Sequence, residues 1–183
     1  MPVPFVHLHV HSAYSLLEGA LQIPSIIELA SKDGQPAVAV TDRNNLFGAL
    51  EFSEKAVKKG LQPIMGCKLA VKFTESENKS NRHIDYPFLV LLAASETGFS
   101  NLRILISNAH LENDVHGLPH VTLELLRAHG EGIICLTGGS EGPINQSITD
   151  GKIAEAETLL NELSTIYSDR LYIELHRHSP KDR

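Results

Sequence analysis

The sequence predicts an α/β fold in a single domain. Short runs of valine, isoleucine and leucine alternate with longer segments in which apolar residues recur every three or four positions. The short runs are apolar on both faces, which is typical of strands buried in a mainly parallel sheet between helices. A chain of 183 residues is long enough for one domain with a substantial core and short for two. Periodicity leaves two architectures open, a doubly wound open sheet and a barrel.

Six segments are predicted as strands, and helices separate most of them. The strands are residues 5–10, 36–42, 62–73, 87–93, 131–139 and 169–178, which are rich in β-branched and other apolar residues. The polar residues 74–85 are expected to form a loop or a hairpin. In parallel α/β folds the carboxyl ends of the strands gather the functional side chains. We expect His11, Asp42, Lys68, Gly139 and His176 to project there.

Five amphipathic segments are predicted as helices. They are residues 23–34, 45–60, 98–111, 122–130 and 152–168. Their ends carry the usual signals, because Pro24 lies in a first turn, and Gly34, Gly60 and Gly130 each follow a helix.

Composition excludes several classes of protein. No apolar run approaches the roughly 20 residues that cross a bilayer, and the first ten residues lack the features of a signal peptide, so we expect a cytoplasmic protein without a membrane partner. Cys67 and Cys135 lie far apart in apolar runs and are interpreted as buried small hydrophobes. A net charge of −6 argues against a main DNA-binding module.

Common nucleotide-binding and nucleophile motifs are missing from the sequence. It contains no G-x-G-x-x-G, no Walker loop and no G-x-S-x-G. The glycine-rich stretch "LTGGSEGPINQS", residues 136–147, is interpreted as a turn after a strand rather than as a phosphate site.

Three alternating histidines near the start point to a metal site. His7, His9 and His11 would share one face of a strand, and Glu18 follows after a turn. Two imidazoles about 7 Å apart can lean onto one divalent ion, and a carboxylate can close the site. The alternative is that these imidazoles are hydrogen-bonded groups of the core or its rim.

A resemblance to a known family strengthens the metal interpretation. The stretches "FVHLHVHSAYSLLEGA", "AVAVTDRNNLFGALEF", "LQPIMGCKLAV", "FLVLLAASETGFSNL", "GIICLTGGSEG" and "LYIELHRH" resemble, in order and spacing, the successive motifs of the PHP (polymerase and histidinol phosphatase) domain. More narrowly, they resemble the PHP domain at the N-terminus of the alpha subunits of bacterial replicative DNA polymerases. The resemblance implies a distorted (β/α)7-type barrel with a multinuclear metal site at the strand ends.

The resemblance also assigns metal ligands, residue by residue. His9 and His11 match the family's paired histidines, and Glu18 matches the acid that follows them. The closing aspartate–histidine pair of the family would lie on a later strand. The chain is therefore expected to be one PHP domain over residues 1–183, cut from a longer polymerase chain before the last strand or strands of its barrel.

Four further ligand positions carry residues that do not bind cations. Arg43 and Lys68 stand where the family has a histidine and a glutamate, and Phe88 and Gly139 stand where it has a histidine and a cysteine or histidine. Arginine stays protonated, an ammonium group repels a metal ion, and the other two side chains offer no lone pair. At most one weakly bound divalent ion, zinc or manganese, is expected.

The two cations are expected to replace metal–ligand bonds by ion pairs with Glu18 and Asp42. His7, Asp42, His176 and His178 are further candidates for lining the former metal cavity.

Two functions from different classes remain open. In the first, implied by the resemblance, the parent chain copies DNA with Mg²⁺, and this domain is a metal-depleted structural and docking module. Its partners would be the proofreading exonuclease subunit, other replicase subunits and, through the parent chain, DNA. In the second, the domain is an active metal-dependent phosphoesterase or 3′–5′ exonuclease with His9, His11 and Glu18 as ligands. An error-prone paralogue of the polymerase also stays open.

Overall fold

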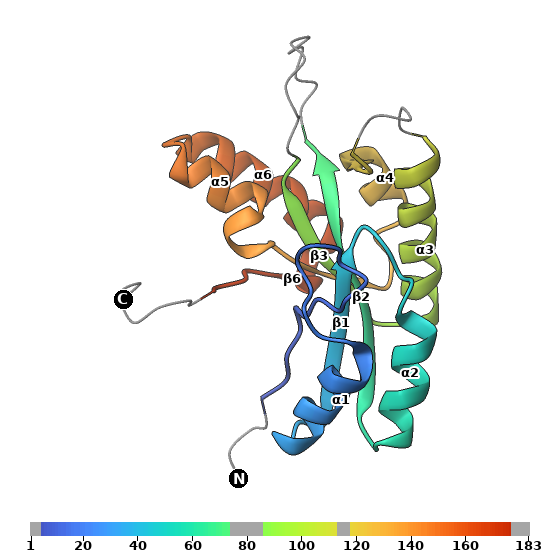
Figure 1. The fold of residues 1–183 in the computed structure, drawn as a ribbon. Helices are drawn as coiled ribbons and strands as arrows, with labels where there is room; N and C mark the ends of the chain where they lie inside the picture. Colours follow the sequence, from blue (N-terminus) through green and yellow to red (C-terminus); the bar gives the residue numbers. More distant parts are fainter. Residues whose placement is uncertain (1–4, 74–85, 113–117, 177–183) are drawn as a thin grey trace.

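The computed structural model describes residues 5–73, 86–112 and 118–176 (Figure 1). The strands are β1 (Ala37–Arg43), β2 (Gln62–Lys72), β3 (Phe88–Ala93), β4 (Val121–Thr122), β5 (Ile133–Leu136) and β6 (Leu171–Tyr172). The helices are α1 (Ile23–Lys32), α2 (Ala49–Lys58), α3 (Glu96–Leu111), α4 (Leu123–Ala128), α5 (Pro143–Thr149) and α6 (Ile153–Tyr167). Two short 3₁₀ turns, η1 (Gly139–Glu141) and η2 (Ser168–Arg170), complete the order. None of the helices in these ranges is long and apolar enough to cross a membrane.

The sheet is parallel except for one reversed strand. Its order is β1-β2-β3-β5-β6, with β4 paired to β2. The pairs β1–β2, β2–β4 and β5–β6 are parallel, whereas β3 is antiparallel to both β2 and β5. β2 and β3 are antiparallel neighbours, so the chain enters β3 in the direction opposite to that of β2. The α/β prediction is confirmed, and the mixed sheet departs from it only in the direction of β3.

The segment before α1 runs beside β1 without forming a regular strand, which corrects the strand predicted there. The amide of Ala39 donates to the carbonyl of His7 (2.9 Å), and the amide of Thr41 donates to the carbonyl of Val10 (2.8 Å). Three residues of the segment therefore lie opposite two residues of β1, as in a β-bulge. Because of this extra residue, the side chains between His7 and Val10 do not alternate regularly between the two faces. The Thr41 hydroxyl stabilises the irregularity, because it accepts from the Val10 amide at 2.9 Å.

Three other elements differ from the prediction. The stretch interpreted only as a turn contains a helix, α5, which begins at Pro143 directly after Gly142. The two-residue strand β4 was not expected. The last strand is shorter than predicted, because β6 ends at Tyr172 and residues 173–176 continue without regular pairing. The predicted loop or hairpin at 74–85 and His178 lie outside the described residues.

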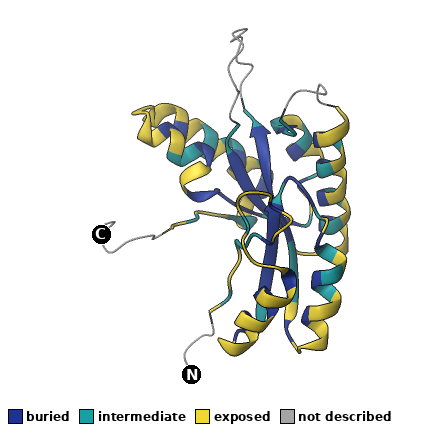
Figure 2. Cartoon of the chain, viewed as in Figure 1, coloured by how far each residue is buried: buried dark blue, intermediate teal, exposed yellow. Residues whose placement is uncertain are grey.

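Apolar side chains of the sheet and helices form the core, and the helices present their polar faces outward (Figure 2). The largest cluster joins β2, β3 and β5 to α3, α4 and α6, with Leu102, Leu126 and Tyr167 fully buried in it. A second cluster packs α1 and α2 against β1. Cys67 and Cys135 are free and buried, which confirms their interpretation as small core residues.

The sheet brings its functional positions to one edge. Arg43 at the end of β1 pairs in register with Lys68 of β2, and Lys68 pairs with Val90 of β3. Val90 in turn pairs with Leu136 of β5, and Leu136 pairs with Tyr172 of β6, so these five residues lie side by side across the sheet. Because β3 is reversed, its first residues lie at the edge where the other strands end. Residues that follow β1, β5 and β6 therefore meet residues that begin β3.

Candidate metal centre

The loop after the N-terminal segment is anchored by a buried aspartate. Asp42 is 3% exposed, and its carboxylate accepts from the Ser12 amide (2.7 Å) and from the hydroxyls of Ser12 and Ser15 (both 2.6 Å). Charge-assisted hydrogen bonds of this kind are stronger than neutral ones. The expected ion pair between Asp42 and the cations is wrong, since in the described ranges no lysine or arginine lies within ion-pair distance of its carboxylate. Asp42 instead fixes the loop that carries Glu18.

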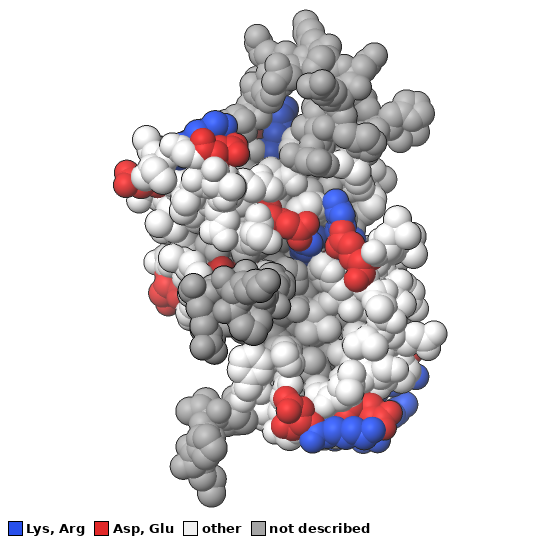
Figure 3. Space-filling model, turned by 60° about the vertical axis from the view of Figure 1, so that its left-hand side comes forward, with Lys and Arg blue, Asp and Glu red and all other residues white. Residues whose placement is uncertain are grey.

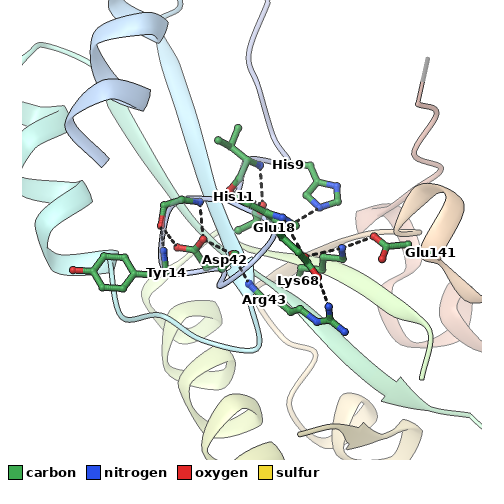
Figure 4. Close-up of polar contacts among 12 residues, drawn as sticks. His9, His11, Tyr14, Glu18, Asp42, Arg43, Lys68 and Glu141 are labelled. Atoms are coloured by element: carbon green, nitrogen blue, oxygen red, sulfur yellow. Dashed lines mark hydrogen bonds and ion pairs between the residues drawn. The ribbon is translucent and has the colours of Figure 1, made fainter. Parts of the chain in front are cut away.

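Glu18 lies between two cations. Its carboxylate pairs with the guanidinium of Arg43, and its second oxygen lies 3.6 Å from the ammonium of Lys68 (Figure 4). Lys68 also pairs with Glu141, from η1. His11 joins the group, with Nδ1 3.4 Å from the Glu18 carboxylate. We call these five residues, His11, Glu18, Arg43, Lys68 and Glu141, the Glu18 cluster. The predicted pairing of both cations with Glu18 is confirmed.

Burial and the cations of the Glu18 cluster shift the pKa values of two of its members, Glu18 and His11. Burial alone would raise the pKa of Glu18, but the charge of Lys68 and the hydrogen bond and charge of Arg43 outweigh burial and lower it below the usual value. Burial lowers the pKa of His11, and the charge of Lys68 lowers it further. At neutral pH the cluster therefore contains an ionised Glu18 beside a neutral imidazole.

Phe88 and Gly139 lie at the same edge and supply no donor atom. The ring of Phe88 packs under both cations, with the Arg43 guanidinium carbon 4.5 Å and the Lys68 ammonium 5.0 Å from its centre. A Cβ atom at Gly139 would lie 2.6 Å from the His176 ring, so the imidazole of His176 fills the space of the missing side chain.

Glu174 is a candidate ligand that the sequence interpretation missed. Its Oε1 lies 2.6 Å from His9 Nδ1 and 2.6 Å from His176 Nε2. Ligand atoms of these three residues all lie within 4.8 Å of one another, and we call them the His9 triad. Burial alone would raise the pKa of Glu174, but His9 and His176 lower it by more. The alternation in "YIELHRH" puts Glu174 and His176 two residues apart, which was the available signal.

His9 connects the two groups of ligands, whereas His7 takes part in neither. The Nε2 atoms of His9 and His11 are 3.3 Å apart, while Nδ1 of His9 faces Glu174. His7 packs edge-on against Phe5, with ring centres 4.8 Å apart. It borders, together with the His9 triad, a pocket of about 850 Å³ whose floor is apolar. The break in side-chain alternation explains why only two of the three histidines meet.

A family model describing the PHP domain matches residues 7–178 of the chain. The chain belongs to the PHP domain family. A DNA polymerase III alpha subunit from Caulobacter vibrioides is 44% identical over 174 residues, covering 95% of this chain and 15% of that protein. An error-prone DNA polymerase from Symbiobacterium thermophilum is 35% identical over 187 residues, covering 94% and 16%. The chain thus spans about one sixth of the length of these curated relatives.

The PHP-type fold is also found in solved structures. A protein from Bifidobacterium adolescentis, named as a metal-dependent phosphoesterase, aligns with 96% of this chain and 87% of its own, with a TM-score of 0.54 and 13% identity. At this identity the likeness establishes the fold alone. The barrel-type fold expected from the resemblance is confirmed.

The charges of this PHP domain are mixed. On the face in Figure 3, basic and acidic side chains lie next to one another, and the coloured residues of that view form no continuous basic area. Proteins that bind nucleic acid through counterion release present such an area. Within the site, positions 43 and 68, where the resemblance implies metal ligands, carry cations that pair with the carboxylate of Glu18. The residues at this edge therefore do not fit a multinuclear metal centre.

Proposed function

We propose that this chain is the PHP domain of a DNA polymerase III alpha subunit, whose parent chain performs template-directed DNA synthesis in the cytoplasm during replication. Similarity to an alpha subunit over 95% of the chain supports this assignment. Magnesium would serve the polymerase reaction elsewhere in the parent chain, outside this domain.

The role of the domain itself is structural and recruiting, and its multinuclear metal centre is lost. One observation carries this proposal: the Glu18 carboxylate, a ligand position in the family, is paired with Arg43 and Lys68. A divalent ion at this place would need to displace two cations from their acid and then remain beside them, at an unfavourable Coulomb energy in a partly buried site. At most one divalent ion, zinc or manganese, binds away from these cations.

The partner of the domain is the proofreading exonuclease subunit of the replicase, and DNA is reached through the rest of the parent chain. A domain that has kept its core and lost catalytic metals is suited to docking, because binding needs a stable surface and no reactive centre. The mixed charges of the surface in Figure 3 agree with a protein partner better than with direct DNA binding.

Titration calorimetry of the full-length alpha subunit with its cognate exonuclease subunit tests the partner. We expect a stable complex. Cross-linking mass spectrometry of that complex should then link exposed lysines of this domain, such as Lys32, Lys55 and Lys152, to the exonuclease. A matched sample of the alpha subunit alone controls for internal links. A stable complex whose cross-links all lie outside residues 1–183 would contradict the docking role.

A second function is favoured by the His9 triad. Three donor atoms within 4.8 Å of one another, at the mouth of a pocket, would suit a metal-dependent phosphoesterase or 3′–5′ exonuclease. This alternative predicts hydrolysis of a phosphoester or of single-stranded DNA with added zinc or manganese, and loss of that activity in His9→Ala. The docking proposal predicts no activity above that of the His9→Ala variant.

A further inference from the structure

The two ring nitrogens of His9 face different surroundings. Nε2 faces His11, and beyond it lies the Glu18 cluster with two fixed cations. Nδ1 faces Glu174, whose same oxygen also meets Nε2 of His176. A single metal ion can bind only one of these nitrogens, so it lies either beside the Glu18 cluster or beside Glu174 and His176. The position of the charges therefore decides which side of His9 is suited to a cation.

The Nδ1 side has the better electrostatics for a cation. Glu174 has His9 and His176 as its ion-pair partners, and no lysine or arginine of the described ranges lies within ion-pair distance of it. The carboxylate of Glu18, in contrast, pairs with Arg43 and Lys68. A divalent ion beside Glu174 gains the attraction of a carboxylate without competition from a fixed positive charge.

Glu174 has an unused oxygen atom. Its Oε2 is buried, and it has no hydrogen-bond partner among the described residues, while the side chain as a whole is only 9% exposed. A buried carboxylate oxygen without a partner is costly, and such atoms in native proteins call for an explanation such as an ion. Both imidazoles contact Oε1, and neither forms a hydrogen bond with Oε2. A bound ion would give the Glu174 carboxylate the additional partner that hydrogen bonds do not supply.

The donor set and its access also suit a transition metal. Two imidazoles and one carboxylate form a common set for zinc, with water or a substrate in the fourth position. Ligand atoms around tetrahedral zinc lie about 3.4 Å apart, as follows from metal–ligand distances of about 2.0–2.1 Å. The contacts of 2.6 Å would therefore open by less than about 1 Å. All three residues border the 850 Å³ pocket, which gives an ion a route to the site.

We propose that the chain binds a single divalent transition-metal ion, zinc or one of similar ligand preference, through His9 Nδ1, Glu174 and His176 Nε2. The ion would lie on the opposite side of His9 from the ligand set of His9, His11 and Glu18 that the family resemblance predicts. This site deepens the one-ion part of the proposed function and rests on it, but it is independent of docking to an exonuclease.

Cobalt(II) titration of the metal-free, full-length protein containing this chain tests the site. Cobalt bound by imidazoles in low coordination absorbs visible light far more strongly than cobalt in oxygen-ligand sites, so polymerase carboxylates do not interfere. We expect one equivalent of absorbing cobalt, displaced by zinc. Glu174→Gln and His176→Ala should each weaken binding at least tenfold. Glu18→Gln should stay within about threefold of the wild type, because it removes no ligand.

His129→Ala is the matched control for His176→Ala, because it removes a histidine far from the triad, beside Asn101. It should bind cobalt as the wild type does. The proposal is overturned if the wild type binds no absorbing cobalt, or if Glu18→Gln loses the ion while Glu174→Gln and His176→Ala keep it. Titrating Glu174→Gln with the exonuclease subunit separates the two proposals, since docking should persist when the ion is lost.

Discussion

The ammonium group of Lys68 lies 3.6 Å from the carboxylate of Glu18, although the Lys68 side chain is only 3% exposed. A buried lysine normally needs a partner, because transfer of a charge out of water is costly. Here Glu18 and Glu141 both supply one. The lysine is therefore part of the structure at a position where the family resemblance implies a metal ligand.

Replacing Lys68 should show that its charge is not required for stability. In Lys68→Met, Glu18 keeps Arg43, and Glu141, whose side chain is 52% exposed, is solvated, so no buried charge loses its only partner. We expect a free energy of unfolding within about 1 kcal/mol of the wild type. Lys68→Ala, which also leaves a cavity, should lose about 2–3 kcal/mol. Urea unfolding at pH 7 measures both.

A loss above about 3 kcal/mol in Lys68→Met would contradict this account, because it would mean that Glu18 depends on Lys68 and not on Arg43. The same variant should raise the pKa of His11, since Lys68 contributes to its lowering. A ¹H–¹³C NMR titration of the imidazole follows that change, and an unmoved His11 midpoint would show that burial alone sets it.

Glu18 should make stability depend on acid pH. Its pKa is lower in the folded protein than in the unfolded chain, so the unfolded chain binds a proton first as the pH falls. The stabilisation is fully present above the ordinary carboxyl pKa of about 4.3, and it is lost as the pH falls through the lowered value. The difference in unfolding free energy between wild type and Glu18→Gln should be constant from pH 6 to 8 and shrink from pH 5 to 3.

Urea unfolding at several pH values provides this comparison. Glu174, whose pKa is also lowered, contributes equally to both proteins and cancels in the difference. A difference that stays the same down to pH 3 would indicate that Glu18 gains nothing from its cations. High salt should reduce the difference, because the Glu18 side chain is 25% exposed and its ion pairs are partly screened.

Removing the aspartate that anchors the loop should destabilise the protein. Asp42→Ala leaves the Ser12 amide and two hydroxyls without their shared acceptor in a buried place. We expect a loss of about 3 kcal/mol, measured by chemical denaturation. Ser15→Ala removes one of the three bonds to Asp42 and also the bond that the Ser15 hydroxyl accepts from the Arg43 amide, and it should cost about 1–2 kcal/mol. Equal losses in the two variants would show that Asp42 acts through Ser15 alone.

The contact between Gly139 and His176 can be tested by adding one methyl group. Gly139→Ala places a Cβ 2.6 Å from the His176 ring, at a φ of +58°. Gly34→Ala is the matched control, because Gly34 has a similar φ of +70° and no atom within 4 Å of the added Cβ. Both variants bear backbone strain of about 1 kcal/mol. Gly139→Ala should lose about 1 kcal/mol more by thermal unfolding and weaken cobalt binding.

If Gly139→Ala and Gly34→Ala lose the same stability, the His176 ring has room to move and the added methyl group is accommodated. Cobalt binding by Gly34→Ala should equal that of the wild type, since Gly34 lies two residues after the end of α1 and its added Cβ meets no atom within 4 Å.

Local sequence patterns predicted most of the elements. Amphipathic periodicity and the glycine and proline signals located α1, α2, α3, α4 and α6 to within a few residues. They missed α5, because "GPINQS" carries turn residues and too short an apolar pattern. They also predicted a regular first strand, since alternation in "FVHLHV" does not reveal that Thr41 would interrupt its pairing with β1.

The sequence predicted only part of the candidate site. The residue types at His9, His11, Glu18, Arg43 and Lys68, read with the family resemblance, predicted that cations stand at ligand positions and pair with Glu18; the pairing is found in the structure. Glu174 was not assigned, because its alternation with His176 in "YIELHRH" does not reveal that His9 would lie beside it. Its role depends on β6 lying beside β5 and reaching His9, which is 165 residues away in the chain.

By itself, the sequence determined the α/β class, the order of most elements and the chemical character of the site, because periodicity and residue type act over a few neighbouring positions. Only the tertiary structure decided the reversed direction of β3, the separation of His7 from His9, and the meeting of His9 with Glu174 and His176. These features depend on which strands pair and in what register, and that is settled by long-range packing and hydrogen bonding rather than by any local stretch of the chain.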